Sequence, residues 1–242
     1  MIFEGAISVK AILNNKRRKI NKLYIRKGKD DRNTRYIIGL AEKAEVNIEY
    51  VDETIINELA SGYTHGGILL DAEGRDYNKL SDLLVKNNFI AVIDGIEDPF
   101  NLGYAMRSLY AFGCTGFIIS NRRLTQVESN ILKSSAGAYE DLKIYKSENL
   151  VEDINYLKTK NIKIYAMQRS NDSVALDDIK FENNMAFIVG GEKRGISKEL
   201  LKEVDELIYI PYDNNFRNAL NASSAITCIG FMKYLQKNEK TM

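Results

Sequence analysis

Three segments in the last two-thirds of the chain carry residue types that could form one polar site. They are IEDPFNLGYAMRSLYAFG (96–113), GGEKRGIS (190–197) and IPYDNNFRNALNASSA (210–225). Each follows a short apolar run that predicts a strand: FIAVIDGI, MAFIV and ELIYI. Because ligands of open α/β sheets bind at the carboxyl ends of the strands, the three segments predict one shared pocket.

The first and third segments offer amides and a guanidinium. Asn101 could orient a substrate or could only cap the helix that follows it, and Arg107 could bind phosphate through its planar fork or be a surface cation. Asn221 lies among small residues that allow a helix to pack closely on a ligand, and it could equally belong to an N-capping cluster.

The second segment resembles a cradle lined by backbone groups. Gly190 and Gly191 follow a strand, Glu192 comes next, and Gly195 precedes a helix. The segment lacks the GK[ST] of a Walker A loop and is not GxGxxG, which argues against a nucleotide di- or triphosphate. An ordinary strand–turn–helix connection is the alternative interpretation.

The elements that must position these residues alternate between strand and helix. Residues 1–75 predict a small α/β domain, residues 76–87 a linker that could hold a short helix at LSDLL, and residues 88–242 a second α/β domain. Strands alternating with helices predict a mainly parallel sheet with helices on both faces. The predicted helices are 5–14, 33–45, the short TIINELA (54–60), 101–112, 126–136, 149–160, 198–204 and 218–237. The predicted strands of the first domain are KLYIRK, NIEYVD and GGILLDA.

Charge is unevenly distributed along the chain. The net charge is +1, but residues 1–40 hold eleven Lys and Arg against three Asp and Glu, a local charge of +8. Such a field attracts phosphate backbones, so we predict that this segment binds RNA; a solvated helix face is the alternative. The predicted contacts are Lys16, Arg17, Arg18 and Lys19.

Composition excludes several other classes of protein. No apolar run approaches the roughly 20 residues that span a bilayer, and Glu4 and Lys10 interrupt any signal-peptide pattern, which predicts a cytoplasmic protein. Cys114 and Cys228 are too few for a disulfide framework or a zinc site, so we predict no metal and buried, inert thiols.

The three segments, in this order, resemble the SpoU (TrmH) family of RNA ribose methyltransferases, which belongs to the SPOUT superfamily. The matching stretches are DPFNLGYAMRSLYAFG, FIVGGEKRGIS and IPYDNNFRNALNASSA, within residues 88–242. GAISVKAIL, KLYI and THGGIL resemble the family's N-terminal substrate-binding domain. The resemblance implies a C-terminal trefoil knot that holds S-adenosylmethionine, a homodimer, and an RNA substrate, with ribosomal RNA first and transfer RNA second.

The family's functional residues fall on particular positions of this chain. The resemblance implies a catalytic set of Asn101, Arg107, Glu192 and Asn221. It implies cofactor contacts at Gly190, Gly191, Ile210 and Leu220.

The chain departs from the family pattern at two positions. Phe100 replaces the glycine of DPGN, and Ala219 replaces the serine of SLN. Phe100 could stack on an unstacked base of the RNA, or it could equally be packing filler. These departures keep open a catalytically weak RNA-binding protein of the same fold, and a small-molecule enzyme is a third class that leaves the +8 segment unexplained.

Overall fold

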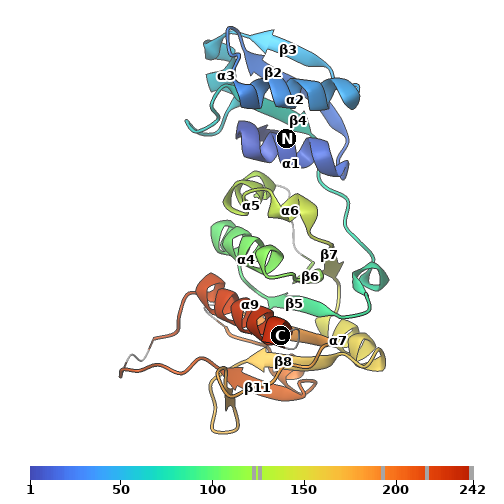
Figure 1. Cartoon of the computed structure of the whole chain (residues 1–242), viewed down its shortest axis with the longest axis vertical. Helices are drawn as coiled ribbons and strands as arrows, with labels where there is room; N and C mark the ends of the chain where they lie inside the picture. The colour runs from blue at the N-terminus through green and yellow to red at the C-terminus, as the bar shows by residue number, and fades with distance from the viewer. Residues whose placement is uncertain (122–123, 125–126, 192–193, 216–217, 240–242) are drawn as a thin grey trace. The chain divides into compact units, whose positions relative to one another are not determined.

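The computed structural model describes residues 1–121, 124, 127–191, 194–215 and 218–239 (Figure 1). They form two compact units. The first comprises residues 1–76 together with two helices, α5 (Glu128–Ser134) and α6 (Ala138–Asp141). The second holds the rest of the described chain, including all three segments of the predicted site.

Among the described residues of the first unit, four strands form a mixed sheet. Their bounds are Ile2–Glu4 (β1), Ile20–Arg26 (β2), Ile48–Val51 (β3) and Ile68–Ala72 (β4). The order is β1-β4-β2-β3, with β2 and β3 parallel and the other two pairs antiparallel. The helices of this part are α1 (Gly5–Asn15), α2 (Arg32–Lys43) and α3 (Glu53–Leu59). The predicted helices and strands are confirmed, and β1 is an additional strand.

The interior of the first unit contains a buried ion cluster. The Arg18 guanidinium donates to Glu128 Oε2 at 2.6 Å and to Glu140 Oε1 at 2.7 Å, and its side chain is fully buried. Burial alone lowers the pKa of Arg18, but Glu140 and then Glu128 outweigh burial, so the pKa is raised. The predicted contact between Arg18 and RNA is therefore wrong. Its guanidinium is buried and donates to the carboxylates of Glu128 on α5 and Glu140 on α6.

In the described part of the second unit, seven strands form a sheet in which every pairing is parallel. Their bounds are Phe89–Asp94 (β5), Gly116–Ser120 (β6), Ile144–Ser147 (β7), Lys163–Met167 (β8), Val174–Ala175 (β9), Met185–Gly190 (β10) and Glu206–Tyr209 (β11). The order is β7-β6-β5-β10-β8-β11-β9. The predicted parallel α/β sheet is confirmed, and the trefoil knot stays a prediction.

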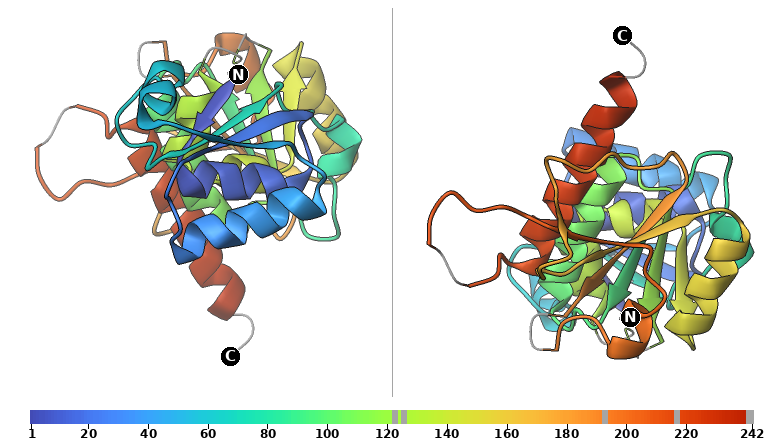
Figure 2. Two further views of the ribbon diagram at one scale, coloured as in Figure 1. Left: turned by 90° about the horizontal axis from the view of Figure 1, so that it is seen from above. Right: turned by 90° about the horizontal axis from the view of Figure 1, so that it is seen from below.

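Helices flank this sheet. Their bounds are Leu80–Leu83 (η1, a 3₁₀ helix), Pro99–Ala111 (α4), Leu150–Thr159 (α7), Lys198–Leu201 (α8) and Ala222–Glu239 (α9). α9 runs alongside α4 (Figures 1 and 2), and Thr227 Oγ1 donates to Ser108 Oγ at 2.8 Å between them. Within the described residues, no helix is long and apolar enough to cross a membrane.

Two details of the helices differ from the sequence prediction. Asp98, not Asn101, is the N-cap of α4, since its side chain accepts a hydrogen bond from the backbone N–H of Asn101 at 2.7 Å. α9 begins at Ala222 instead of residue 218. The prediction of a buried thiol is confirmed for Cys114, and burial raises its pKa to about 12. It is wrong for Cys228, which is only half-buried on α9.

Candidate active site

The first two segments meet at one edge of the sheet, as predicted. β5 and β10 are neighbouring parallel strands, and their last residues, Asp94 and Gly190, are paired in the register. The N–H of Gly191 donates to Asp94 O at 2.8 Å, and the N–H of Ser197 donates to Asp94 Oδ2 at 3.0 Å. Asp94 therefore ties both ends of the GGEKRGIS segment to the end of β5.

Gly190 and Gly191 let three stretches of backbone approach closely. A Cβ on Gly190 would lie 2.1 Å from the carbonyl carbon of Gly195, and one on Gly191 would lie 2.3 Å from Gly95 O. The N–H of Gly195 also donates to Gly191 O at 2.9 Å, which closes the loop on itself. Because the obstacles are backbone atoms, no side-chain rotation could make room for a larger residue.

A cavity of 630 Å³ opens beside this glycine loop; we call it the glycine cavity. It is lined by Met167, Val189, Gly190, Gly191, Gly195, Ala219, Leu220, Asn221, Ala222 and Ala225. A cavity of 290 Å³ adjoins it, shares Met167, Ala219, Leu220 and Ala225 with it, and adds Ile210 and Tyr212. Tyr212 also accepts a hydrogen bond from the N–H of Leu220 at 3.1 Å. All four predicted cofactor positions therefore line this pair of cavities.

The first and third segments are joined by a hydrogen bond between two asparagines. Asn221 Nδ2 donates to Asn101 Oδ1 at 3.1 Å, across 120 positions of the sequence. Asn221 Oδ1 accepts from the N–H of Ser223 at 2.9 Å, at the start of α9. Asn221 thus belongs to an N-capping cluster, one of the two alternatives left open by the sequence, and is also a partner of Asn101. Its role toward a ligand stays a prediction.

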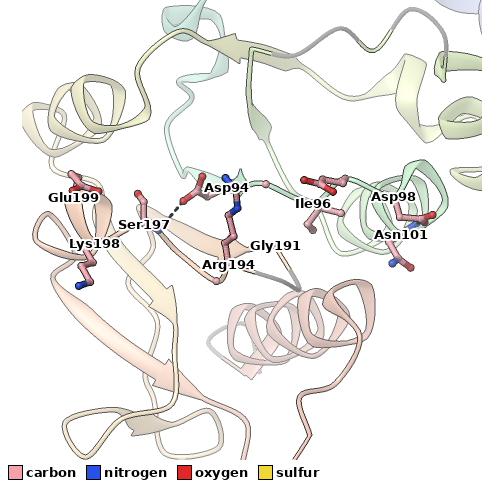
Figure 3. A pocket seen from close by; sticks show the side chains of 12 residues that line it. Asp94, Ile96, Asp98, Asn101, Gly191, Arg194, Ser197, Lys198 and Glu199 are labelled. Carbon is pink, nitrogen blue, oxygen red and sulfur yellow. Dashed lines mark hydrogen bonds between the residues drawn. The ribbon is translucent and has the colours of Figure 1, made fainter.

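A third cavity, of 510 Å³, lies on the Asn101 side of this pair; we call it the polar cavity (Figure 3). It shares Gly191 and Gly195 with the glycine cavity. Figure 3 shows Arg194 extending from the glycine loop to the level of Asp94, with Asn101 and Asp98 on one side and Lys198 and Glu199 on the other. The Asn101–Asn221 pair thus lies where the two cavities meet.

Of the other two residues of the predicted catalytic set, Arg107 is not brought to this junction. Arg107 is exposed on α4 and lines neither the glycine cavity nor the polar cavity. Glu192 lies outside the described residues. Asp94 and Arg194 also line the polar cavity and were not predicted from the sequence. Both could have been found, because Asp94 ends the apolar strand and Arg194 stands within GGEKRGIS.

The predicted RNA-binding residues of the N-terminal unit differ in exposure. Lys16 and Lys19 are exposed and Arg17 is half-buried. Lys19 forms an ion pair with Glu73 at 3.0 Å, in which both side chains remain solvent-accessible. Exposed pairs of this kind are weak, so Lys19 can exchange its partner for a phosphate.

Two family models match the chain. The model described as the SpoU rRNA Methylase family covers residues 88–231, and the one described as RNA 2'-O ribose methyltransferase substrate binding covers residues 2–78. The fold and these matches define an enzyme that methylates RNA and carries its own substrate-binding domain. The chain belongs to the SpoU rRNA Methylase family.

Curated relatives cover nearly the whole chain. The 23S rRNA (guanosine-2'-O-)-methyltransferase RlmB of Photorhabdus laumondii is 31% identical over 93% of each chain. The putative TrmH family tRNA/rRNA methyltransferase YacO of Bacillus subtilis is 28% identical over 91% of this chain and 90% of its own.

Solved structures share the fold. The SpoU methyltransferase AviRb of Streptomyces viridochromogenes aligns with a TM-score of 0.83 and 17% identity, over 99% of this chain and 90% of its own. An AdoMet-bound rRNA methyltransferase of Sinorhizobium meliloti aligns with a TM-score of 0.79 and 19% identity, over 96% and 85%.

Proposed function

We propose that this chain transfers a methyl group from S-adenosylmethionine to the ribose 2′-hydroxyl of a guanosine in ribosomal RNA. The observation that carries the proposal is the hydrogen bond between Asn101 and Asn221, which lies where the glycine cavity meets the polar cavity. A ribose held at this junction would lie between a cofactor on one side and the rest of the nucleotide on the other. The name of the 31% identical relative supports the choice of guanosine in ribosomal RNA.

The glycine cavity suits S-adenosylmethionine. Its walls are mostly backbone, small and apolar side chains, and its 630 Å³ falls within the range of about 300–1,000 Å³ typical of small-molecule sites. The two glycines whose Cβ atoms would collide with backbone keep this wall free of side chains. When bound, the cofactor supplies a methyl group that its sulfonium already activates, so the protein's main task is alignment.

The two asparagines orient the ribose. Asn101 is held by Asn221, which is itself held by the start of α9, so the amide is fixed before the substrate arrives. Holding two reacting groups in line can contribute roughly 7–11 kcal/mol to catalysis. In the transfer, the 2′-oxygen would bond to the methyl carbon as the carbon–sulfur bond breaks, which would leave the demethylated cofactor, and the hydroxyl proton would pass to water. A role for Glu192 in orienting Asn101 or the loop stays a prediction.

Arg107 binds a phosphate of the RNA near the target nucleotide. A role in stabilising the alkoxide that develops on the 2′-oxygen stays a prediction of the family resemblance, because Arg107 lines neither cavity. A guanidinium keeps its proton at neutral pH, so it acts as a cation and hydrogen-bond donor. Its exposure on α4 supports contact with a macromolecular substrate and not with a buried cofactor.

The domain boundaries are part of the proposal. Residues 1–75 present RNA, residues 76–87 connect, and residues 88–242 carry out methyl transfer. The matched family ranges, 2–78 and 88–231, support this division. Lys16, Arg17 and Lys19 supply phosphate contacts, and the protein works in the cytoplasm.

We also propose that the chain is a homodimer through its catalytic domains. α4 and α9 expose a set of large apolar side chains: Tyr104, Tyr110, Phe231, Tyr234 and Leu235. Tyr104 is 49% exposed and Phe231 is 47% exposed. Apolar surface of this kind often marks an interface. A monomeric mass by light scattering at micromolar concentration, with full activity, would contradict the dimer.

The substrate is tested by mapping ribose methylation in ribosomal and transfer RNA from cells with and without this protein. The proposal predicts that one guanosine of ribosomal RNA loses its 2′-O-methyl group in the absence of the protein. Loss of a methyl group from transfer RNA alone would contradict the proposed substrate and leave the methyl-transfer chemistry intact.

A further inference from the structure

We infer that the polar cavity binds the base of the target nucleotide and selects guanine, through Asp94 and Arg194. The inference rests on the proposed function, because it assumes that the ribose lies at the Asn101–Asn221 pair. With the ribose at this pair, the cofactor would occupy the glycine cavity on the Asn221 side. The polar cavity, on the Asn101 side, is then the space left for the base. A volume of 510 Å³ is ample for a base that has been splayed out of its stack.

The charges of the polar cavity favour a base over a phosphate. The described residues that line it include four carboxylates, from Asp94, Glu97, Asp98 and Glu199, and two cations, from Arg194 and Lys198. Their net charge of −2 opposes a phosphate group, which would add negative charge to a negative site. An uncharged base with N–H donors meets no such opposition.

Asp94 is placed to accept hydrogen bonds from a base. It is half-buried at the end of β5, and its Oδ2 already accepts from the N–H of Ser197 at 3.0 Å. This bond fixes the carboxylate, and an ionised carboxylate retains further acceptor sites. Guanine offers two adjacent donors, N1–H and the N2 amino group, that match one carboxylate.

Arg194 complements the other edge of guanine. Among the residues that the structure describes, none forms an ion pair or hydrogen bond with its exposed guanidinium. Arginine donates to O6 and N7 of guanine as a fork, the commonest specific contact between proteins and bases. Asp94 and Arg194 both line the polar cavity (Figure 3), so acceptor and donor groups are available to one base.

The same pair of side chains disfavours the other bases. Adenine has an acceptor, N1, where guanine has a donor, so it would set a lone pair against Asp94. Cytosine and uracil each offer a single donor group on this edge and lack the N7 acceptor. A carboxylate and a guanidinium in one cavity therefore fit guanine best.

The test combines enzyme variants with altered bases at the mapped target nucleotide. The variants are Asp94→Asn and Arg194→Ala, with Lys202→Ala as a control that removes an exposed cation outside the polar cavity. The RNA carries guanosine, inosine (which lacks the N2 amino group) or 7-deazaguanosine (which lacks N7). The measured quantity is kcat/KM for each combination, with calorimetry of S-adenosylmethionine binding to each variant.

We expect the wild-type enzyme and Lys202→Ala to prefer guanosine over either analogue by roughly tenfold or more, as for one lost base contact. Asp94→Asn should lose the preference over inosine, and Arg194→Ala should lose the preference over 7-deazaguanosine. Each variant should bind the cofactor within about twofold of wild type.

A target that is not guanosine would contradict the guanosine of the proposed function and this inference together. Two results would overturn the inference while the proposed function stands. They are equal rates of wild-type enzyme on all three RNAs, and variants that slow all three RNAs by one common factor. The last result would mean that the residues only support the loop. Failure to methylate any ribosomal RNA would refute the proposed function and this inference with it.

Discussion

Gly190→Ala should weaken the binding of S-adenosylmethionine while leaving the protein folded. The added methyl group would lie 2.1 Å from the carbonyl carbon of Gly195 and 2.4 Å from both its oxygen and the nitrogen of Ile196. All three are backbone atoms, so the loop itself has to move. The change therefore acts directly on the wall of the glycine cavity.

The size of the effect follows from the displacement. Real Cβ contacts are essentially never shorter than 3.0 Å, so the Gly195 carbonyl has to move from 2.1 Å by about 0.9 Å. That shift stretches the hydrogen bond from the N–H of Gly195 to Gly191 O, now 2.9 Å long. Overpacking of this kind costs about 1–3 kcal/mol, so we expect roughly tenfold to hundredfold weaker cofactor binding.

The assay is calorimetric titration of S-adenosylmethionine into the full chain, with thermal unfolding as a check on the fold. Gly39→Ala is the matched control, because nothing lies within 4 Å of the Cβ it would add in α2. The control should bind the cofactor like wild type and be at least as stable, since alanine favours a helix by about 0.8–1 kcal/mol over glycine. A dissociation constant for Gly190→Ala within twofold of wild type would refute this account of the loop.

Three further changes test the roles of cationic residues. Arg107→Ala should abolish methyl transfer and leave cofactor affinity, measured by calorimetry, within about threefold, because Arg107 contacts RNA; surviving activity would show that its assigned role is wrong. Neutral residues in place of Lys16, Arg17 and Lys19 should weaken RNA binding and lower the log–log salt slope by roughly 0.7–0.9 per lost phosphate contact, and an unchanged slope would mean that RNA binds another surface. Arg18→Met should instead reduce the free energy of unfolding by about 3–5 kcal/mol in urea titrations, since it leaves two buried carboxylates unpaired; a change below about 1 kcal/mol would contradict the buried cluster.

The fold could be predicted well from the sequence because its strands are distinct apolar runs. FIAVID and MAFIVG become the adjacent strands β5 and β10, both buried over almost their whole length. The short strands β1 and β9, of three and two residues, carry no periodicity to detect. The order of strands in the sheet is set by tertiary packing and was left open by the sequence.

The site was predicted in part, and the gaps have physical causes. Asn101 and Asn221 form a hydrogen bond across 120 positions of the sequence. The residues alone do not reveal that the two lie together; only the family resemblance placed both in one catalytic set. Arg18 was misassigned because a run of four basic residues is typical of an exposed face. Only the fold shows that Glu128 and Glu140 enclose its side chain.

The central claim is tested most directly by following the methyl group itself. The full chain is incubated with methyl-labelled S-adenosylmethionine and ribosomal RNA that lacks modifications, and the RNA is digested to nucleosides and separated. The account predicts label in one 2′-O-methylnucleoside, 2′-O-methylguanosine. Label on a base, or no label in RNA despite calorimetric binding of the cofactor, would contradict it.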